Sequence, residues 1–188
     1  MLREKIIQSI DESIGVKGLL RESQLKQIEL VAKAMIATIK NGHKILVFGN
    51  GGSAADSMHI AAELVGRFKK ERKAIPAIAL GTNVSVLTSL SNDYRFEYAF
   101  EREIEALGRH GDMALGISTS GRSKNVIRGI VKASKMGLKT AALTGREGPI
   151  SKVADITIKV PSKSTPRIQE AHILIGHILC EIVEDALS

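Results

Sequence analysis

The chain has 188 residues, which is enough for one domain with a full hydrophobic core. Hydrophobic residues make up 44% of it and charged residues 25%, as is typical of a soluble globular protein. Aromatic residues make up only 3%, which argues against a protein that stacks single-stranded nucleic acid on aromatic rings. The net charge of +7 is spread along the chain and is consistent with an anionic ligand, while the one dense basic run, 69–73, is interpreted as a solvated face or turn.

The expected elements begin with helix. Residues 1–41 carry apolar side chains at helical spacing, with a second helix expected from Glu22 to Lys40 and a stop at Gly42. Short apolar runs suited to buried strands then alternate with helical segments, which predicts a five-stranded parallel sheet between two layers of helices. We expect one α/β domain over 1–188, with 1–41 as a helical extension and 42–188 as the core. The strands are expected at 44–49, 76–81, 112–117, 139–144 and 155–160. The helical segments are expected at 53–67, 84–107 (in one or two pieces), 123–137, 149–153 and 166–187.

The single cysteine, Cys180, excludes an internal disulfide and fits a reducing compartment. The N-terminal residues lack the apolar region and cleavage site of a signal peptide, and the apolar runs are too short to span a membrane. We therefore expect a cytoplasmic protein that binds neither nucleic acid nor membrane.

Two segments rich in glycine and hydroxyl groups follow predicted strands. "NGGS" (50–53) follows the first strand, and "STSGRS" (118–123) follows the third. Ligands of open parallel sheets bind beyond the carboxyl ends of the strands, where free N–H groups at a helix start can hold a phosphate. Serine also caps helices, but two such boxes after neighbouring strands favour a phosphate pocket. Neither box is a Walker loop or a complete GxGxxG, so we expect a small phosphorylated ligand rather than a nucleotide.

Nitrogen and oxygen ligands recur on two predicted helices. His59 and Glu63 are four residues apart and share one helical face, where they form either half of a metal site, an acid–base pair or an ordinary surface pair. On the last helix, Gln169 and His177 are eight residues apart in the sequence, or about 80° around the axis. Three or four such groups are what zinc or a similar divalent ion takes.

The motifs together resemble one family. The segments are "GNGGSAADSMHIAAELVGRF", "SND", "GISTSGRSKNVI", "LTG" and "RIQEAHILIGHILCEIVE", and they extend over nearly the whole chain. They resemble the SIS (sugar isomerase) domain family and, within it, the phosphoheptose isomerases. The resemblance implies a three-layer α/β/α fold and a homotetramer with active sites at subunit interfaces. It also implies isomerisation of sedoheptulose 7-phosphate to D-glycero-D-manno-heptose 7-phosphate, for the heptose of lipopolysaccharide or related glycans.

The resemblance also implies roles for individual residues. Glu63 and His177 are the expected acid–base pair, and one zinc ion per subunit is bound by His59, Glu63, Gln169 and His177. The expected phosphate ligands are Ser53, Ser118, Ser120 and Ser123. The expected sugar site is lined by Asn50, Gly51, Gly52, Glu63, Arg67, Asn92, Asp93, Thr119 and Gln169. His172 is not a ligand in this pattern, and we expect it to be structural.

One position departs from the family pattern. Some members carry an acidic residue before the arginine of "RIQE", whereas Pro166 stands here, so a sugar contact from this position is in doubt and Thr165 is a candidate substitute. Two related kinds of protein with other functions are the alternatives. One is a non-catalytic SIS adaptor that binds the replication initiator, and the other is a regulator that senses sugar phosphates. All four metal positions are kept here and no DNA-binding module is visible, so the enzyme is favoured.

Overall fold

The core of the protein is a parallel β-sheet. In the computed structural model, which describes residues 1–145 and 147–188, five strands lie in the order β2-β1-β3-β4-β5 and every neighbouring pair is parallel. The expected fold class is confirmed. The edge strand β2 is only three residues long and half-buried, shorter than predicted. The strands are β1 (Ile45–Gly49), β2 (Ala77–Ala79), β3 (Met113–Ser118), β4 (Lys139–Thr144) and β5 (Ile156–Lys159).

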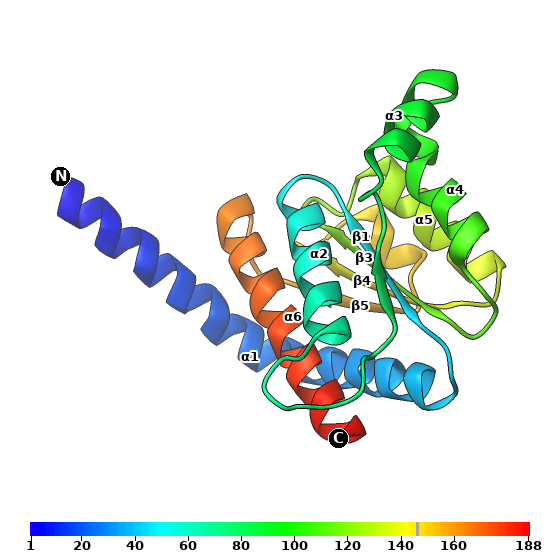
Figure 1. The fold of residues 1–188 in the computed structure, drawn as a ribbon. Helices are drawn as coiled ribbons and strands as arrows, with labels where there is room; N and C mark the ends of the chain where they lie inside the picture. Colours follow the sequence, from blue (N-terminus) through cyan, green and yellow to red (C-terminus); the bar gives the residue numbers. More distant parts are fainter. Residues whose placement is uncertain (146) are drawn as a thin grey trace.

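Helices cover both faces of this sheet, as Figure 1 shows. The segment expected to be helical over 84–107 divides into two α-helices joined by a 3₁₀ turn. The α-helices are α1 (Leu2–Lys40), α2 (Gly52–Val65), α3 (Val84–Asp93), α4 (Ala99–Leu107), α5 (Lys124–Lys135) and α6 (Thr165–Leu187), and the 3₁₀ helices are η1 (Phe96–Tyr98) and η2 (Pro149–Lys152).

Alternate side chains of the strands enter two separate cores. On one face, Val47 and Leu115 pack with residues of α1, α2 and α6. On the other face, Leu46 and Phe48 pack with residues of α4 and α5. The central strands β1 and β3 are buried along their whole length, which explains their near-continuous apolar sequence.

The N-terminal segment is one helix of 39 residues rather than the two that we expected. No proline interrupts it, and Gly15 and Gly18 only weaken a helix without ending it. Its C-terminal half packs on α6 and the sheet, with Leu20 as the first buried residue. Its N-terminal half projects away from the body of the domain (Figure 1). That half exposes large apolar side chains, namely Leu2, Ile6, Ile7, Ile10 and Ile14.

Across residues 1–145 and 147–188, no helix combines the length and the hydropathy that a membrane crossing requires.

Candidate active site

The sheet order brings the two predicted phosphate boxes together. The chain leaves β1 toward β2 on one side and continues from β3 toward β4 on the other, so the topology switches between β1 and β3. Gly49, the last residue of β1, pairs with Ile117 near the end of β3. The boxes that follow these strands therefore lie side by side at the switch point, where open α/β sheets bind their ligands.

The first box is a tight turn into α2. Gly51 is the N-cap and has φ of 57°, a conformation that favours glycine. The Ser53 N–H donates to the carbonyl of Asn50 at 3.0 Å. The side-chain amides of Asn50 and Asn125 exchange two hydrogen bonds of 2.9 and 2.8 Å, so Asn50 fixes the start of α5 beside the turn. Asn125, which is buried, was missed in the sequence because asparagine at a helix start has no distinctive spacing.

The second box joins β3 to α5. Ser123 is the N-cap of α5, as expected, but its hydroxyl does not cap the helix. It lies 3.0 Å from the hydroxyl of Ser118, which is itself buried. Thr119 and Ser120 line a cavity of about 500 Å³, which is also lined by Thr165 at the start of α6. Thr165 and Pro166 lie in the first turn of α6, and a sugar contact from Thr165 stays a prediction.

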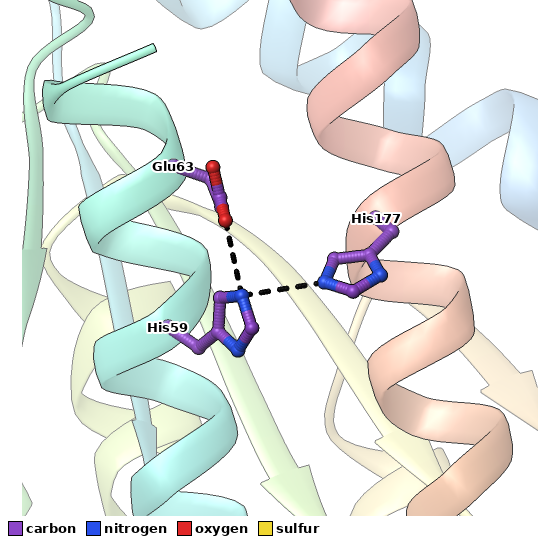
Figure 2. A group of neighbouring side chains, drawn as sticks. All are labelled: His59, Glu63 and His177. Carbon is purple, nitrogen blue, oxygen red and sulfur yellow. Dashed lines mark hydrogen bonds and ion pairs between the residues drawn. The ribbon is translucent and has the colours of Figure 1, made fainter. Parts of the chain in front are cut away.

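The metal-ligating side chains gather between α2 and α6. His59 Nε2 lies 3.0 Å from Glu63 Oε1 and 3.3 Å from His177 Nε2. Figure 2 shows these three side chains converging from the two helices. All three ligand atoms lie within 4.8 Å of one another. Zinc holds such ligands tetrahedrally at about 2.1 Å, which sets neighbouring ligand atoms about 3.4 Å apart, so this group of residues fits a divalent ion.

A close approach of the two helices makes this cluster possible. A Cβ on Gly176 would stand 2.8 Å from Cδ1 and Cγ1 of Ile60, so only glycine lets the helices approach this closely. One turn further along α6, the Sγ of Cys180 lies 3.9 Å from the carbonyl of the same Ile60. His177, the next residue on α6, brings its Nε2 to within 3.3 Å of the Nε2 of His59.

The fourth expected ligand does not join the cluster within one chain. The amide of Gln169 occupies the space beside Gly52 where a Cβ would stand, at the beginning of α2. Gln169 lies eight residues before His177 on α6, which is about two turns or 12 Å along the helix axis. Gln169 is placed instead beside the first phosphate box.

Three other predicted sugar contacts are exposed in the single chain. Arg67 is exposed after the end of α2. Asn92 and Asp93 are exposed at the end of α3, where the Asn92 amide donates to the Asp93 carboxylate at 2.9 Å. Helix α3 buries none of its residues and projects from the body of the domain (Figure 1).

Two other titratable side chains lie on the same helices as the cluster, His172 on α6 and Asp56 on α2. His172 is fully buried, and burial lowers the pKa of its imidazole to about 4 although Nε2 lies 3.2 Å from the carbonyl of Thr144. The expected structural position of His172 is thus observed. Asp56, one turn before His59, was missed in the sequence, where a lone carboxylate inside a helix has no signal.

The basic run 69–73 is only partly a solvated turn. The Arg72 side chain is 4% exposed and pairs with Glu184, which is 1% exposed, at 3.1 Å. Arg72 also donates to the carbonyls of Glu63 and Leu64, both at 2.8 Å. Burial raises the pKa of Glu184, but N–H groups of 68–70 and Arg72 outweigh it and hold that pKa at about 2. The interpretation as a solvated face is therefore wrong for Arg72, whose partner lies 112 residues away.

Comparisons with known proteins agree with this architecture. A family model of the SIS domain matches residues 11–145. The phosphoheptose isomerase of Aquifex aeolicus is 55% identical over 183 residues, which is 97% of this chain and 96% of that protein. The solved structure of a phosphoheptose isomerase from Neisseria gonorrhoeae has a TM-score of 0.93 at 39% identity and covers 98% of this chain and 100% of that one. The structure of the enzyme from Francisella tularensis has a TM-score of 0.95 at 36% identity, covering 98% and 99%. The chain therefore belongs to the SIS domain family and, within it, to the phosphoheptose isomerases.

Proposed function

We propose that this chain catalyses the isomerisation of sedoheptulose 7-phosphate to D-glycero-D-manno-heptose 7-phosphate, in the synthesis of heptose for lipopolysaccharide or related glycans. The observation that carries this proposal is the cluster of His59, Glu63 and His177, with gaps of 3.0 and 3.3 Å between neighbouring ligand atoms. An adaptor that only binds another protein would not need this combination of base, acid and metal ligands in one place.

The residues of the cluster suit a proton transfer between neighbouring carbons. The Glu63 carboxylate removes a proton from C1 of the ketose, which gives an enediolate, and returns it to C2. The imidazole of His177 moves the hydroxyl proton from O1 to O2, so the carbonyl ends on C1 and no atom is gained or lost. The Glu63 side chain is 24% exposed, which leaves it open to a substrate.

We propose that one zinc ion per subunit is bound by His59, Glu63 and His177, with Gln169 as a further ligand. When bound, zinc would stabilise negative charge on the sugar oxygens. The imidazoles already turn their Nε2 atoms toward a common point, so the chain contributes a largely formed ligand set.

The phosphate of the substrate is assigned to the two boxes at the switch point. Ser53 and Ser118 are buried there, whereas Ser120 and Thr119 line the cavity of about 500 Å³. N–H groups at the start of α2 and α5 add positive electrostatic potential at the same place. Binding the phosphate far from the reacting carbons supplies binding energy that holds the sugar in position.

We further propose that the chain acts as a cytoplasmic homotetramer with active sites between subunits. The exposed apolar side chains of the projecting half of α1, such as Ile6 and Ile10, favour burial against other copies. The expected contacts Asn92 and Gln169 lie away from the cluster within one chain, and a second copy would bring such side chains to the site. Replacing Ile10 with Asp should lower the mass measured by light scattering, whereas Lys5→Asp, on the same helix, should leave it unchanged.

The function is tested by assaying purified protein with sedoheptulose 7-phosphate and following the aldose product by NMR. Glu63→Gln and His177→Gln should each lower kcat by about 10²-fold to 10⁴-fold, since each removes a proton-transfer group. Glu181→Gln is the matched control, because Glu181 lies one turn beyond His177 and pairs with Lys69 on the surface. Turnover near the wild-type rate in either cluster variant would disprove the acid–base assignment.

A further inference from the structure

A third carboxylate shares the helical face of the cluster. Asp56 lies on α2, three residues before His59 and seven before Glu63, so the three side chains follow one another along the same side of the helix. The Asp56 residue is half-buried. Asp56 therefore lies beside the proposed metal site, and the family resemblance assigns it no role.

The hydrogen bonding of this carboxylate is incomplete. Within residues 1–145 and 147–188, Oδ2 of Asp56 is buried and has no hydrogen-bond partner. Burial raises the pKa of Asp56, and the nearby imidazoles of His59 and then His177 act in the opposite direction. Leaving a buried acceptor without a donor costs free energy, so a donor is expected in the working state of the protein.

The two imidazoles have the complementary property. Their Nε2 atoms are directed into the cluster, toward each other and toward Glu63 (Figure 2). Among the described residues, Nδ1 of neither His59 nor His177 makes a hydrogen bond, so each ring has a nitrogen free to donate. Imidazoles that bind a metal through one nitrogen almost always donate the other N–H to a carboxylate, carbonyl or water.

We propose that Asp56 is a positioning residue whose carboxylate accepts the Nδ1–H of His59 and thereby fixes the tautomer and ring orientation that direct Nε2 at the metal. This inference rests on the metal site of the proposed function. It assigns His59 as the ring that Asp56 controls, because only His59 lies one turn away on the same helix. This bond would give the buried Oδ2 of Asp56 the donor that it lacks among residues 1–145 and 147–188.

The test compares Asp56→Ala and Asp56→Asn with wild type in zinc affinity, measured by competition with a chelator on metal-free protein. The loss of such a partner carboxylate lowers metal affinity by about 10-fold to 100-fold. We expect that loss for Asp56→Ala and a smaller one for Asp56→Asn, which keeps an acceptor oxygen. Glu103→Gln is the matched control: Glu103 is also a carboxylate whose pKa is raised by burial, but it lies on α4 against the other face of the sheet.

A purely structural role for Asp56 would give a different result. In that case urea unfolding of the metal-free protein would show lower stability for Asp56→Ala, with zinc affinity within twofold of wild type, and the inference would be overturned. NMR of ¹⁵N-histidine protein adds a direct readout, since the Nδ1–H proton of His59 should be protected from exchange in zinc-loaded wild type and not in Asp56→Ala.

The two proposals can fail separately. If wild type binds zinc and Asp56→Ala binds it equally well, only the role of Asp56 is overturned. If wild type binds no zinc at any concentration tested, both the metal site and the role of Asp56 are overturned.

Discussion

His59 and His177 are 118 residues apart in the sequence, yet their Nε2 atoms lie 3.3 Å apart. A divalent ion between the two rings would hold both of these nitrogens. We expect zinc to raise the thermal midpoint of the wild-type protein, because a ligand at 100 times its Kd stabilises the folded state by about 2.7 kcal/mol. The increase should disappear in His59→Ala and in His177→Ala, as measured by differential scanning fluorimetry. Equal increases in all three proteins would place the metal elsewhere.

The serines of the second box should control substrate affinity. Ser120→Ala and Ser123→Ala each remove a hydroxyl that we assign to the phosphate, and a hydrogen bond to a charged group contributes about 1.5–3 kcal/mol. Since this contact is made in both the ground state and the transition state, KM should rise by about tenfold or more with a smaller change in kcat. Steady-state kinetics measure both constants. Ser23→Ala on α1, whose hydroxyl bonds the carbonyl of Leu19, should leave both unchanged.

The approach of α2 to α6 should depend on Gly176. Gly176→Ala adds a Cβ that would stand 2.8 Å from atoms of Ile60, and overpacking of this kind costs about 1–3 kcal/mol in the free energy of unfolding. Urea denaturation should show this loss, and a second change, Ile60→Val, should recover part of it by removing the contacting methyl group. Gly18→Ala, where no atom lies within 4 Å of the added Cβ, should instead increase stability by about 0.5–1 kcal/mol.

The pair of Arg72 and Glu184 should be critical for folding. Arg72→Met leaves the buried Glu184 carboxylate without its cation, and removing one partner of a buried pair costs about 3–5 kcal/mol. The double variant Arg72→Met with Glu184→Gln should be more stable than Arg72→Met alone, since no unpaired charge remains. Lys70→Met removes the exposed partner of Asp185 and should change the urea midpoint little. A similar midpoint for Arg72→Met and Lys70→Met would contradict the buried pair.

His172 should make the protein less stable in mild acid. The unfolded chain binds a proton at His172 below about pH 6.5, whereas burial holds the pKa of the folded state at about 4. Protonation therefore favours the unfolded chain. The free energy of unfolding should decrease by on the order of 3 kcal/mol as the pH falls from 6.5 toward 4. His172→Gln should flatten the pH dependence of the urea midpoint in this window. An unchanged slope would show that other groups cause the acid sensitivity.

Much of the fold could be predicted because its signals are local. The apolar runs of β1 and β3 and the glycine turn at Gly51 can be recognised from neighbouring residues alone. The parallel direction of the strands follows from the alternation of strands and helices. The division of residues 1–41 into two helices failed because no local break exists near Gly15 or Gly18.

The candidate site also combines features with a local sequence signal and features that depend on tertiary contacts. His59 with Glu63 has a spacing that indicates a shared face, and the structure confirms that they meet. The position of Asn125 against Asn50, the burial of Arg72 by Glu184 and the unpaired oxygen of Asp56 are tertiary features, with no spacing in the sequence to reveal them. For Gln169 the sequence pattern suggested a proximity that the single chain does not have. Gln169 points to a similar side of α6 as His177, but it lies about two turns away along the helix axis.

Cys180 has a practical consequence for experiments on the proposed homotetramer. Its thiol is 1% exposed between α2 and α6, and burial raises its pKa to about 12, so almost no thiolate is available to react. The native chain should therefore react very slowly with maleimide reagents while it is folded. A cysteine introduced on the projecting half of α1 would become the one labelled position, and spin-label distances between copies could then map how the subunits are arranged.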